Sequence, residues 1–361
     1  MPWDRFDPLR DATLKADGYI APPYVIDAHA HIHLHVPREG EKRFKNFYEV
    51  SEQLVLREKA GFIDPKSLIR EMDRYGIDKA CILCADIMYI EFEKYLEFLK
   101  AEPERFIGFF WPMYEDFDLT DLKRDKPPIT PESMADQVEK ALEYPEIKGL
   151  GEGLIIEAAL FCERKGWPTE DMLRFMMPML EVAAAKKAPI LWHSGPDPYK
   201  WIIQKDSRRL YRGYGGHWIM DPMVYDEIAT LFPEIPMIIG HCGVQGSYFY
   251  GSYADHALML AAMHDNVYLE TSMAPAELIE KALANPGIGA EKLIMGSDFG
   301  ATSSWYVYKG QVLPSYKKKP FPELPGMHIE QALRALNEIV MPPEERRLIM
   351  GQNMARILNL E

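Results

Sequence analysis

Histidine and aspartate side chains stand where several apolar runs of this sequence end. His29 and His31 lie in IDAHAHI, His193 ends APILW, His241 ends PMIIG, and Asp298 ends LIMGS. Residues two apart in a strand face the same side, so the two imidazoles of the first run can reach one ion. Imidazole and carboxylate groups suit a borderline divalent metal such as zinc, in a site that keeps room for water. Such an ion would lower the pKa of that water and polarise a carbonyl group.

Each of these residues alone has an ordinary structural explanation. A His-x-His pair is often a surface feature, and a single histidine or aspartate after a strand is often a turn residue or a helix cap. The metal interpretation depends on the joint pattern, in which a polar side chain repeatedly arrives where an apolar run stops. His33 and His35 continue the first run past its end, and we expect both in a loop.

Eight short apolar runs must position these residues. The runs alternate with helical patterns, which is typical of βα units and a parallel sheet. The predicted strands cover residues 24–32, 79–85, 106–111, 147–153, 188–195, 236–243, 267–272 and 292–300. Eight strands favour an α/β fold of the (β/α)8 barrel type, although a doubly wound open sheet shows the same alternation. In a barrel, the polar residues would meet at the carboxyl ends of the strands.

Helix start signals lie between the runs, as a capping side chain often followed by proline. They stand at Asp64-Pro65, Thr130-Pro131, Thr169 and Asp221-Pro222. The segment after Pro343 again has helical spacing.

Length and composition allow one large domain. The chain has 361 residues, of which 47% are hydrophobic, enough for a barrel of roughly 250 residues with insertions. A formal charge of −14 disfavours a nucleic-acid partner. No apolar run reaches the length of about 18 residues that a membrane span needs, and the N-terminus lacks the apolar core of a signal peptide. We therefore expect a cytoplasmic protein with an N-terminal extension over residues 1–23 and a single barrel domain over residues 24–361.

The four cysteines suggest no disulfide framework. Cys81 and Cys84 form a Cys-x-x-Cys motif inside KACILCA. Residues three apart in a strand point to opposite faces, so we expect two buried structural residues rather than a redox or metal pair.

The motifs, in their order, resemble the amidohydrolase superfamily. The segments IDAHAHI, FPEIPMIIGHCG, NVYLETS, KLIMGSDFG and MGQNMARIL are similar to its amidohydrolase-2 branch, which contains aminocarboxymuconate-semialdehyde decarboxylase and related metal-dependent hydrolases. The resemblance runs from about residue 24 to the C-terminus. It implies that His29, His31, His193 and Asp298 bind a divalent metal, with one zinc ion as the simplest case. It also implies that His241 acts as a general base or hydrogen-bonds the substrate, and that Asp298 shares in proton transfer.

Glu152, in KGLGEG at the end of the fourth run, departs from this pattern. Some members of the superfamily place a carboxylate or a carboxylated lysine there to bridge a second metal. Glu152 would do the same, or it would position the substrate. The structural alternative is an ordinary carboxylate paired with a nearby cation such as Lys148.

Two long insertions follow the first and fifth strands, at residues 33–62 and 196–220. Long loops at the catalytic face commonly form lids or binding walls. Candidate substrate-binding residues in the second are Arg208, Arg212, His217 and Trp218, which suit a planar or carboxylate-bearing small molecule. Alternatively, the aromatic residues pack the loop onto the barrel and the arginines stay solvated. The tyrosine-rich segments 245–256 and 303–310 fit either substrate contacts or the contacts of a homo-oligomer.

Three functions from different classes fit these residues. The first is metal-dependent hydrolysis of an ester, lactone or amide-like bond, and the second is non-oxidative decarboxylation of a small unsaturated or aromatic acid. The third, a non-catalytic barrel, is disfavoured because all five strand-end residues are present. Many aromatic-acid decarboxylases of this branch replace the first histidine of His-x-His with glutamate. The chain keeps His29, which favours hydrolysis, although the semialdehyde decarboxylase keeps it too.

Overall fold

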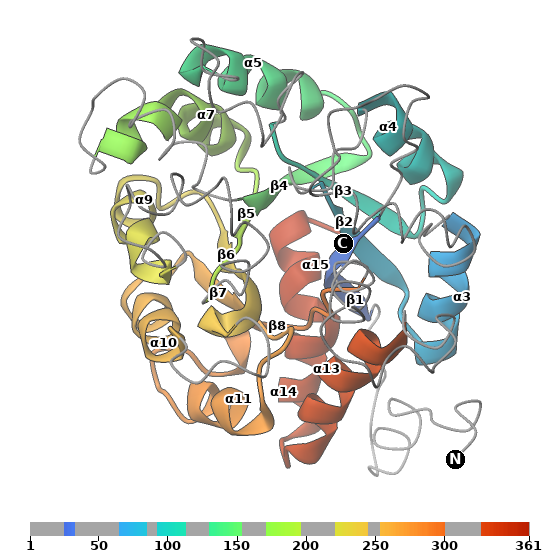
Figure 1. Cartoon of the computed structure of the whole chain (residues 1–361). Helices are drawn as coiled ribbons and strands as arrows, with labels where there is room; N and C mark the ends of the chain where they lie inside the picture. Colours follow the sequence, from blue (N-terminus) through green and yellow to red (C-terminus); the bar gives the residue numbers. More distant parts are fainter. Residues whose placement is uncertain are drawn as a thin grey trace, which may run out of the picture.

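Eight parallel strands form one sheet in sequence order (Figure 1). The computed structural model describes residues 25–32, 65–84, 92–112, 130–153, 171–195, 221–244, 253–299 and 326–360. The strands are β1 (Ile26–His31), β2 (Lys79–Leu83), β3 (Phe106–Phe110), β4 (Ile147–Gly153), β5 (Ile190–Trp192), β6 (Met237–Ile239), β7 (Val267–Glu270) and β8 (Leu293–Ile294). Hydrogen bonds from Ala28 N to Met295 O (3.0 Å) and from His31 N to Phe299 O (2.6 Å) join the first strand to the last segment of the sheet. The sheet is therefore a barrel rather than the open alternative.

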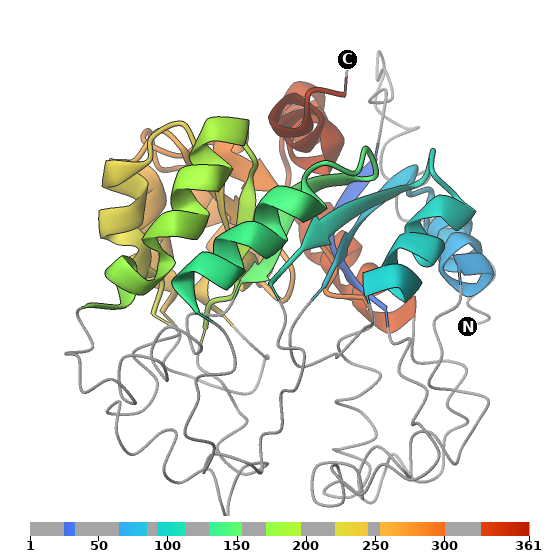
Figure 2. The same cartoon turned by 90° about the horizontal axis from the view of Figure 1, so that it is seen from above.

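Helices follow the strands and surround them on the outside (Figures 1 and 2). They are α3 (Pro65–Tyr75), α4 (Phe92–Ala101), α5 (Pro131–Ala141), α7 (Met172–Lys186), α9 (Asp226–Leu231), α10 (Ala254–Met263), α11 (Ala276–Leu283) and α13 (Gly326–Glu338). This alternation of strand and helix confirms the (β/α)8 barrel that the sequence predicts. None of the helices in the described ranges is long and apolar enough to cross a membrane.

Two of the predicted capping residues, Thr130 and Asp221, can be compared with the structure. Thr130 forms a capping box with Ser133, in which each side chain accepts a hydrogen bond from the other's backbone N–H, at 3.1 and 3.0 Å. Asp221 accepts from Met223 N (3.0 Å), but it begins a short 3-10 helix, η7 (Pro222–Tyr225), ahead of α9. Thr169 lies outside the described residues, within which α7 begins at Met172.

Three strands end earlier than their apolar runs predict, because the chain leaves the sheet before the polar residue. His193 follows β5 directly, His241 lies in a 3-10 turn, η8 (Gly240–Gly243), and Asp298 lies four residues beyond β8. His241 and Asp298 have φ of 60° and 56°, in the left-handed region, where a residue cannot continue a strand. The site residues of β6 and β8 are thus carried by turns.

The C-terminal segment covers one end of the barrel (Figures 1 and 2). It consists of α14 (Pro343–Arg347), a π-helical turn η12 (Leu348–Gln352) and α15 (Asn353–Leu358). Met354, Ile357 and Leu358 pack with the inward-facing residues of the strands in one apolar cluster. The buried Asn353 amide donates to Ala290 O (2.7 Å) and Leu293 O (2.8 Å), which fixes this segment to the start of β8.

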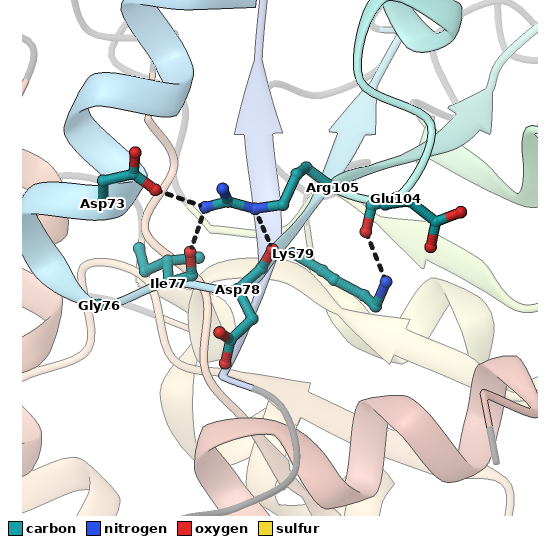
Figure 3. A pocket seen from close by; sticks show the side chains of 7 residues that line it. All are labelled: Asp73, Gly76, Ile77, Asp78, Lys79, Glu104 and Arg105. Carbon is teal, nitrogen blue, oxygen red and sulfur yellow. Dashed lines mark hydrogen bonds and ion pairs between the residues drawn. The ribbon is translucent and has the colours of Figure 1, made fainter.

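A shallow hollow lies beside the start of β2, at the amino ends of the strands (Figure 3). Arg105 crosses it and donates to Asp78 O (2.6 Å), Ile77 O (2.9 Å) and the Asp73 carboxylate (2.9 Å). Lys79 donates to Glu104 O on the other side. These contacts join the end of α3 to the start of β3.

Cys81 and Cys84 confirm the expectation of a buried strand. Cys81 belongs to the apolar cluster inside the barrel, and Cys84 belongs to the cluster between the strands and the helices. Both are fully buried, and burial raises the pKa of the Cys81 thiol well above its ordinary value. The predicted N-terminal extension, residues 1–23, and the two predicted long loops, residues 33–62 and 196–220, lie outside the described residues.

Candidate metal centre

Buried polar side chains gather at the carboxyl ends of the strands. These are His29 and His31 of β1, Glu152 of β4, His193 after β5, His241 of η8, Glu270 of β7, and Asp298 after β8. The active sites of barrel enzymes occupy this end, and the apolar interior cluster lies beneath it.

Two β-bulges turn site residues of β1 and β4 into the barrel. In β1, Asp27 pairs with Ala80 and Ala30 pairs with Ile82, so the register with β2 shifts by one residue. Ile26 and Ala28 face the interior of the barrel, so a regular alternation would direct His29 outward. The extra residue of the bulge changes this alternation, and His29 faces inward. The register of β4 with β5 shifts in the same way between Leu150 and Gly153, which brings Glu152 inward.

The His29 and His31 rings meet edge to face, and their Nε2 atoms lie 3.0 Å apart. Asp298 Oδ1 lies 3.5 Å from the first of these nitrogens and 3.4 Å from the second. Glu152 approaches the same pair with its two oxygens, at 3.6 Å from His29 Nε2 and 3.4 Å from His31 Nε2. Two imidazoles and two carboxylates therefore converge on a small region.

His193 and His241 also face Glu152, at its Oε1 atom. His193 Nδ1 forms a short contact with Glu152 Oε1, and His241 Nε2 lies 3.4 Å from the same oxygen. The Ser194 hydroxyl donates to Gly240 O and accepts from Gly243 N, so it holds the end of β5 against the turn that carries His241.

Glu270 supports the site from behind. Its Oε2 atom lies 2.8 Å from His29 Nδ1, 3.1 Å from His241 N and 2.7 Å from Ser272 Oγ. Ser272 Oγ in turn lies 2.7 Å from His241 Nδ1. A carboxylate that contacts the far nitrogen of a ligating histidine is a common support for metal ligands in proteins.

Asp27 plays a similar part on the other side of β1. It accepts hydrogen bonds from His29 N (3.1 Å), Ser297 N (2.9 Å) and the Ser297 hydroxyl (2.5 Å). Burial raises the pKa of Asp27 to about 6 in spite of these bonds. The contacts place Asp298 next to the histidines of β1.

The charges in the site oppose the effect of burial. Burial alone would raise the pKa of Glu152, but the neighbouring His193 and His29 hold it well below its ordinary value. The pKa of Asp298 is lowered by a hydrogen bond from His31 and by the charges of nearby histidines, again against burial. The pKa of His29 is raised well above its ordinary value, because Glu152 and Glu270 outweigh its burial. The carboxylates stay ionised and make this end of the barrel attractive to a cation.

A family model described as amidohydrolase matches residues 26–360. The chain belongs to the amidohydrolase family. Comparison with curated protein sequences gives no match.

Three solved structures share the fold. A 5-carboxyvanillate decarboxylase from Novosphingobium aromaticivorans, complexed with manganese and 4-hydroxy-3-methoxy-5-nitrobenzoic acid, is 14% identical over 95% of this chain and 96% of its own, with a TM-score of 0.55. An amidohydrolase from Burkholderia multivorans with bound zinc is 12% identical over 93% and 99%, with a TM-score of 0.53. A probable 2-pyrone-4,6-dicarboxylic acid hydrolase from Acinetobacter baumannii with bound citric acid is 14% identical over 93% and 99%, with a TM-score of 0.51. At these identities the likeness concerns the barrel fold.

The donor set of this amidohydrolase fits a divalent metal. Two groups each offer three ligand atoms within 4.8 Å of one another: His29, His31 and Asp298, and His29, Glu152 and His241. Two nitrogens bound to one tetrahedral ion at about 2.0 Å would lie about 3.3 Å apart, close to the 3.0 Å between His29 Nε2 and His31 Nε2. A single proton can lie between those nitrogens, whereas an ion uses the lone pairs of both. The mixture of nitrogen and oxygen atoms suits zinc or manganese.

The structure places the predicted site residues as follows. His29, His31 and Asp298 converge, whereas His193 lies against Glu152 and does not belong to either group of three. Glu152 is buried among histidines, so the alternative pairing with Lys148 is wrong: Lys148 is an exposed residue near the start of β4. Arg208, Arg212, His217 and Trp218, the predicted substrate residues, lie outside the described residues.

Glu270, Ser272 and Asp27 are not among the residues predicted from the sequence. Glu270 ends the apolar run VYL and is followed by Thr-Ser, which is the same signal that identified His193 and Asp298. Asp27 stands inside the first run, two residues before His29. An acidic residue in a strand that is otherwise apolar was the available signal for both.

Proposed function

We propose that this amidohydrolase is a metal-dependent hydrolase of a small carbonyl substrate, with an ester, lactone or amide-like bond. The observation that carries the proposal is the convergence of His29, His31 and Asp298, with Glu152 beside them, at the carboxyl ends of the strands. A divalent ion bound there would lower the pKa of a water and polarise the carbonyl of the substrate.

Different residues would bind the metal and transfer the proton, according to their positions in the site. His29, His31 and Asp298 would hold the ion, and His193 would complete the set. His241 Nε2 faces the same region and accepts the proton of the attacking water. Asp298 shares in this proton transfer, and the hydrogen bonds from its neighbour Ser297 to Asp27 fix its position.

The number of ions that the site binds depends on Glu152. Its Oε1 atom lies near His193, His29 and His241, and its Oε2 atom lies near His31. A carboxylate whose two oxygens face different histidines would be able to contact two ions. We therefore expect Glu152 to contact a second ion when metal is abundant, while His241 stays the proton acceptor.

Metal content and product analysis test the proposal together. Protein purified without added ions would be analysed for metal, stripped with a chelator and reconstituted with zinc or manganese. A panel of lactones, esters, amides and aromatic acids would then be assayed for acid release and for carbon dioxide release, in water enriched in oxygen-18. We expect metal-dependent acid release with oxygen-18 in the product acid. Carbon dioxide release with no oxygen-18 in the organic product would show decarboxylation, the alternative that the sequence leaves open, and would refute hydrolysis.

A matched pair of variants ties the activity to the site. His31→Gln removes a converging nitrogen and should lose metal and activity. His264→Gln changes a histidine between α10 and β7 that contacts Asp226 (2.8 Å), and it should keep both. Retention of metal by His31→Gln would contradict the assignment of the centre.

A further inference from the structure

Glu270 is a buried carboxylate whose hydrogen bonds all lead to the site. It stands at the end of β7 with its side chain fully buried. Its Oε2 atom contacts His29 Nδ1, His241 N and Ser272 Oγ, and its Oε1 atom accepts from Ser272 N. Gly296 leaves room for it, since a Cβ atom at that position would lie 2.2 Å from Glu270 Oε1.

We propose that Glu270 is a positioning residue that sets the tautomer of two site histidines, His29 directly and His241 through Ser272. An ionised carboxylate only accepts hydrogen bonds, so the nitrogen that faces it, His29 Nδ1, carries the proton. The Ser272 hydroxyl has one proton and gives it to Glu270 Oε2, at 2.7 Å. Toward His241 Nδ1, at 2.7 Å, the same oxygen acts as an acceptor, so this nitrogen carries a proton too.

Both imidazoles therefore use Nδ1 for these hydrogen bonds and turn Nε2 toward the site, where the neutral ring offers a lone pair. His29 Nε2 lies 3.5 Å from Asp298 Oδ1, and both His29 Nε2 and His241 Nε2 lie within 3.6 Å of Glu152 Oε1. Bare nitrogens facing carboxylate oxygens repel one another unless a cation or a proton lies between them. Glu270 thus orients both the proposed metal ligand His29 and the proposed proton acceptor His241.

The neighbouring histidine provides a contrast. His31 Nδ1 is buried and has no hydrogen-bond partner in the described part of the chain. No hydrogen bond of the protein selects the tautomer of His31, whereas hydrogen bonds select those of His29 and His241. The tautomers follow from the hydrogen bonds alone. Only the roles of the two Nε2 atoms, metal binding by His29 and proton acceptance by His241, rest on the proposed function.

Nitrogen-15 NMR of the zinc-loaded protein tests the proposal. With the histidines labelled, two-bond proton–nitrogen correlation separates an imidazole protonated at Nδ1 from one protonated at Nε2, and single His29 and His241 variants assign the signals. We expect both rings to be protonated at Nδ1. A proton on Nε2 of either ring in the wild-type protein would overturn the proposal.

Variants of Ser272 and Glu270 separate the two branches. Ser272→Ala cuts the path to His241 alone: we expect a changed His241 signal, a kcat lower by about 10-fold or more, and unchanged KM and zinc affinity. Ser272→Thr keeps the hydroxyl and should restore both the signal and kcat. Glu270→Gln should also weaken zinc binding, by about 10–100-fold in chelator competition.

Thr271→Val is the matched control. Thr271 is the buried neighbour of both residues, and its hydroxyl has no hydrogen-bond partner in the described ranges, so the variant should resemble the wild type in every measurement. A Ser272→Ala protein with an unchanged His241 signal and kcat would overturn the proposal, even if Glu270→Gln fails to fold. The NMR and zinc measurements need no substrate, so they stand if the hydrolase assignment fails.

Discussion

His241 and Asp298 both place their side chains from left-handed backbone. A non-glycine residue there costs on the order of 1–3 kcal/mol, so the surroundings must hold it. Glu270 holds the backbone N–H of His241 at 3.1 Å, and Ser297, itself fixed by Asp27, holds Phe299 N at 3.1 Å. The turns direct both side chains away from their strands and over the mouth of the barrel.

Replacing His241 with asparagine tests its role as proton acceptor. Asparagine tolerates left-handed backbone, so the turn should survive. We expect His241→Asn to keep its metal and to lose activity by about 100-fold or more, the contribution of a general base. Metal content and kcat would be measured beside His264→Asn, which lies outside the site. A His241→Asn protein without metal would make His241 a ligand instead.

The sequence predicts these residues better than it predicts their partners. His29, His31 and Asp298 were found because a polar group ends an apolar run, and the barrel then brings them together. The same rule identifies Glu270 in LETS, but a single strand-end glutamate could equally have been a turn residue. Which imidazole nitrogen faces which carboxylate depends on side-chain rotations that no spacing in the sequence determines.

At the scale of strands and helices, the pairing registers of the strands determine which residues face the interior, and the sequence does not predict these registers. The alternation of apolar runs gives all eight strands, and capping signals give the start of α5. The bulges in β1 and β4 cannot be read from the runs, since a shift of one residue leaves an apolar sequence equally apolar. Those bulges decide that His29 and Glu152 face the interior.

Tyr95 connects a helix to the sheet and gives a test in alkaline solution. Its hydroxyl, on α4, donates to Ile82 O of β2 at 2.6 Å, and burial raises the pKa of this phenol well above its ordinary value. Above a pH of about 10 the unfolded chain ionises at this residue while the folded protein does not, so the free energy of unfolding falls as the pH rises.

We expect Tyr95→Phe to lower the free energy of unfolding by about 1 kcal/mol at pH 7. Above pH 10 the variant should lose stability less steeply than the wild type, because it has no phenol to ionise. Urea unfolding at pH 7, 9, 10 and 11 measures both effects. Parallel curves for the two proteins across this range would contradict the assigned burial of the phenol.

For the molecule as a whole, the two ends of the barrel have different tasks. The carboxyl ends of the strands carry the converging histidines and carboxylates, and the amino ends carry contacts such as those of Arg105. In barrel enzymes the second end serves stability, so changes there should leave the site intact.

Arg105→Met tests this division. Methionine keeps most of the apolar stem but loses the hydrogen bonds to Asp78 O, Ile77 O and Asp73, which should lower the free energy of unfolding by about 2 kcal/mol. Metal affinity should equal that of the wild type. Lys66→Met, on an exposed turn of α3, is the control and should change neither quantity. A weaker metal affinity in Arg105→Met would show that the two ends are coupled.

The seam where the barrel closes has a consequence for biosynthesis. Asp27 and Ser297 hold β1 against the last strand across 270 positions of sequence, and His29 and Asp298 stand beside them. A nascent chain on the ribosome exposes its first two histidines long before their aspartate partner has been translated. Capture of an ion at a complete centre would therefore have to wait until β8 and Asp298 have been made, and a truncated product that stops short of β8 would lack both the seam and Asp298.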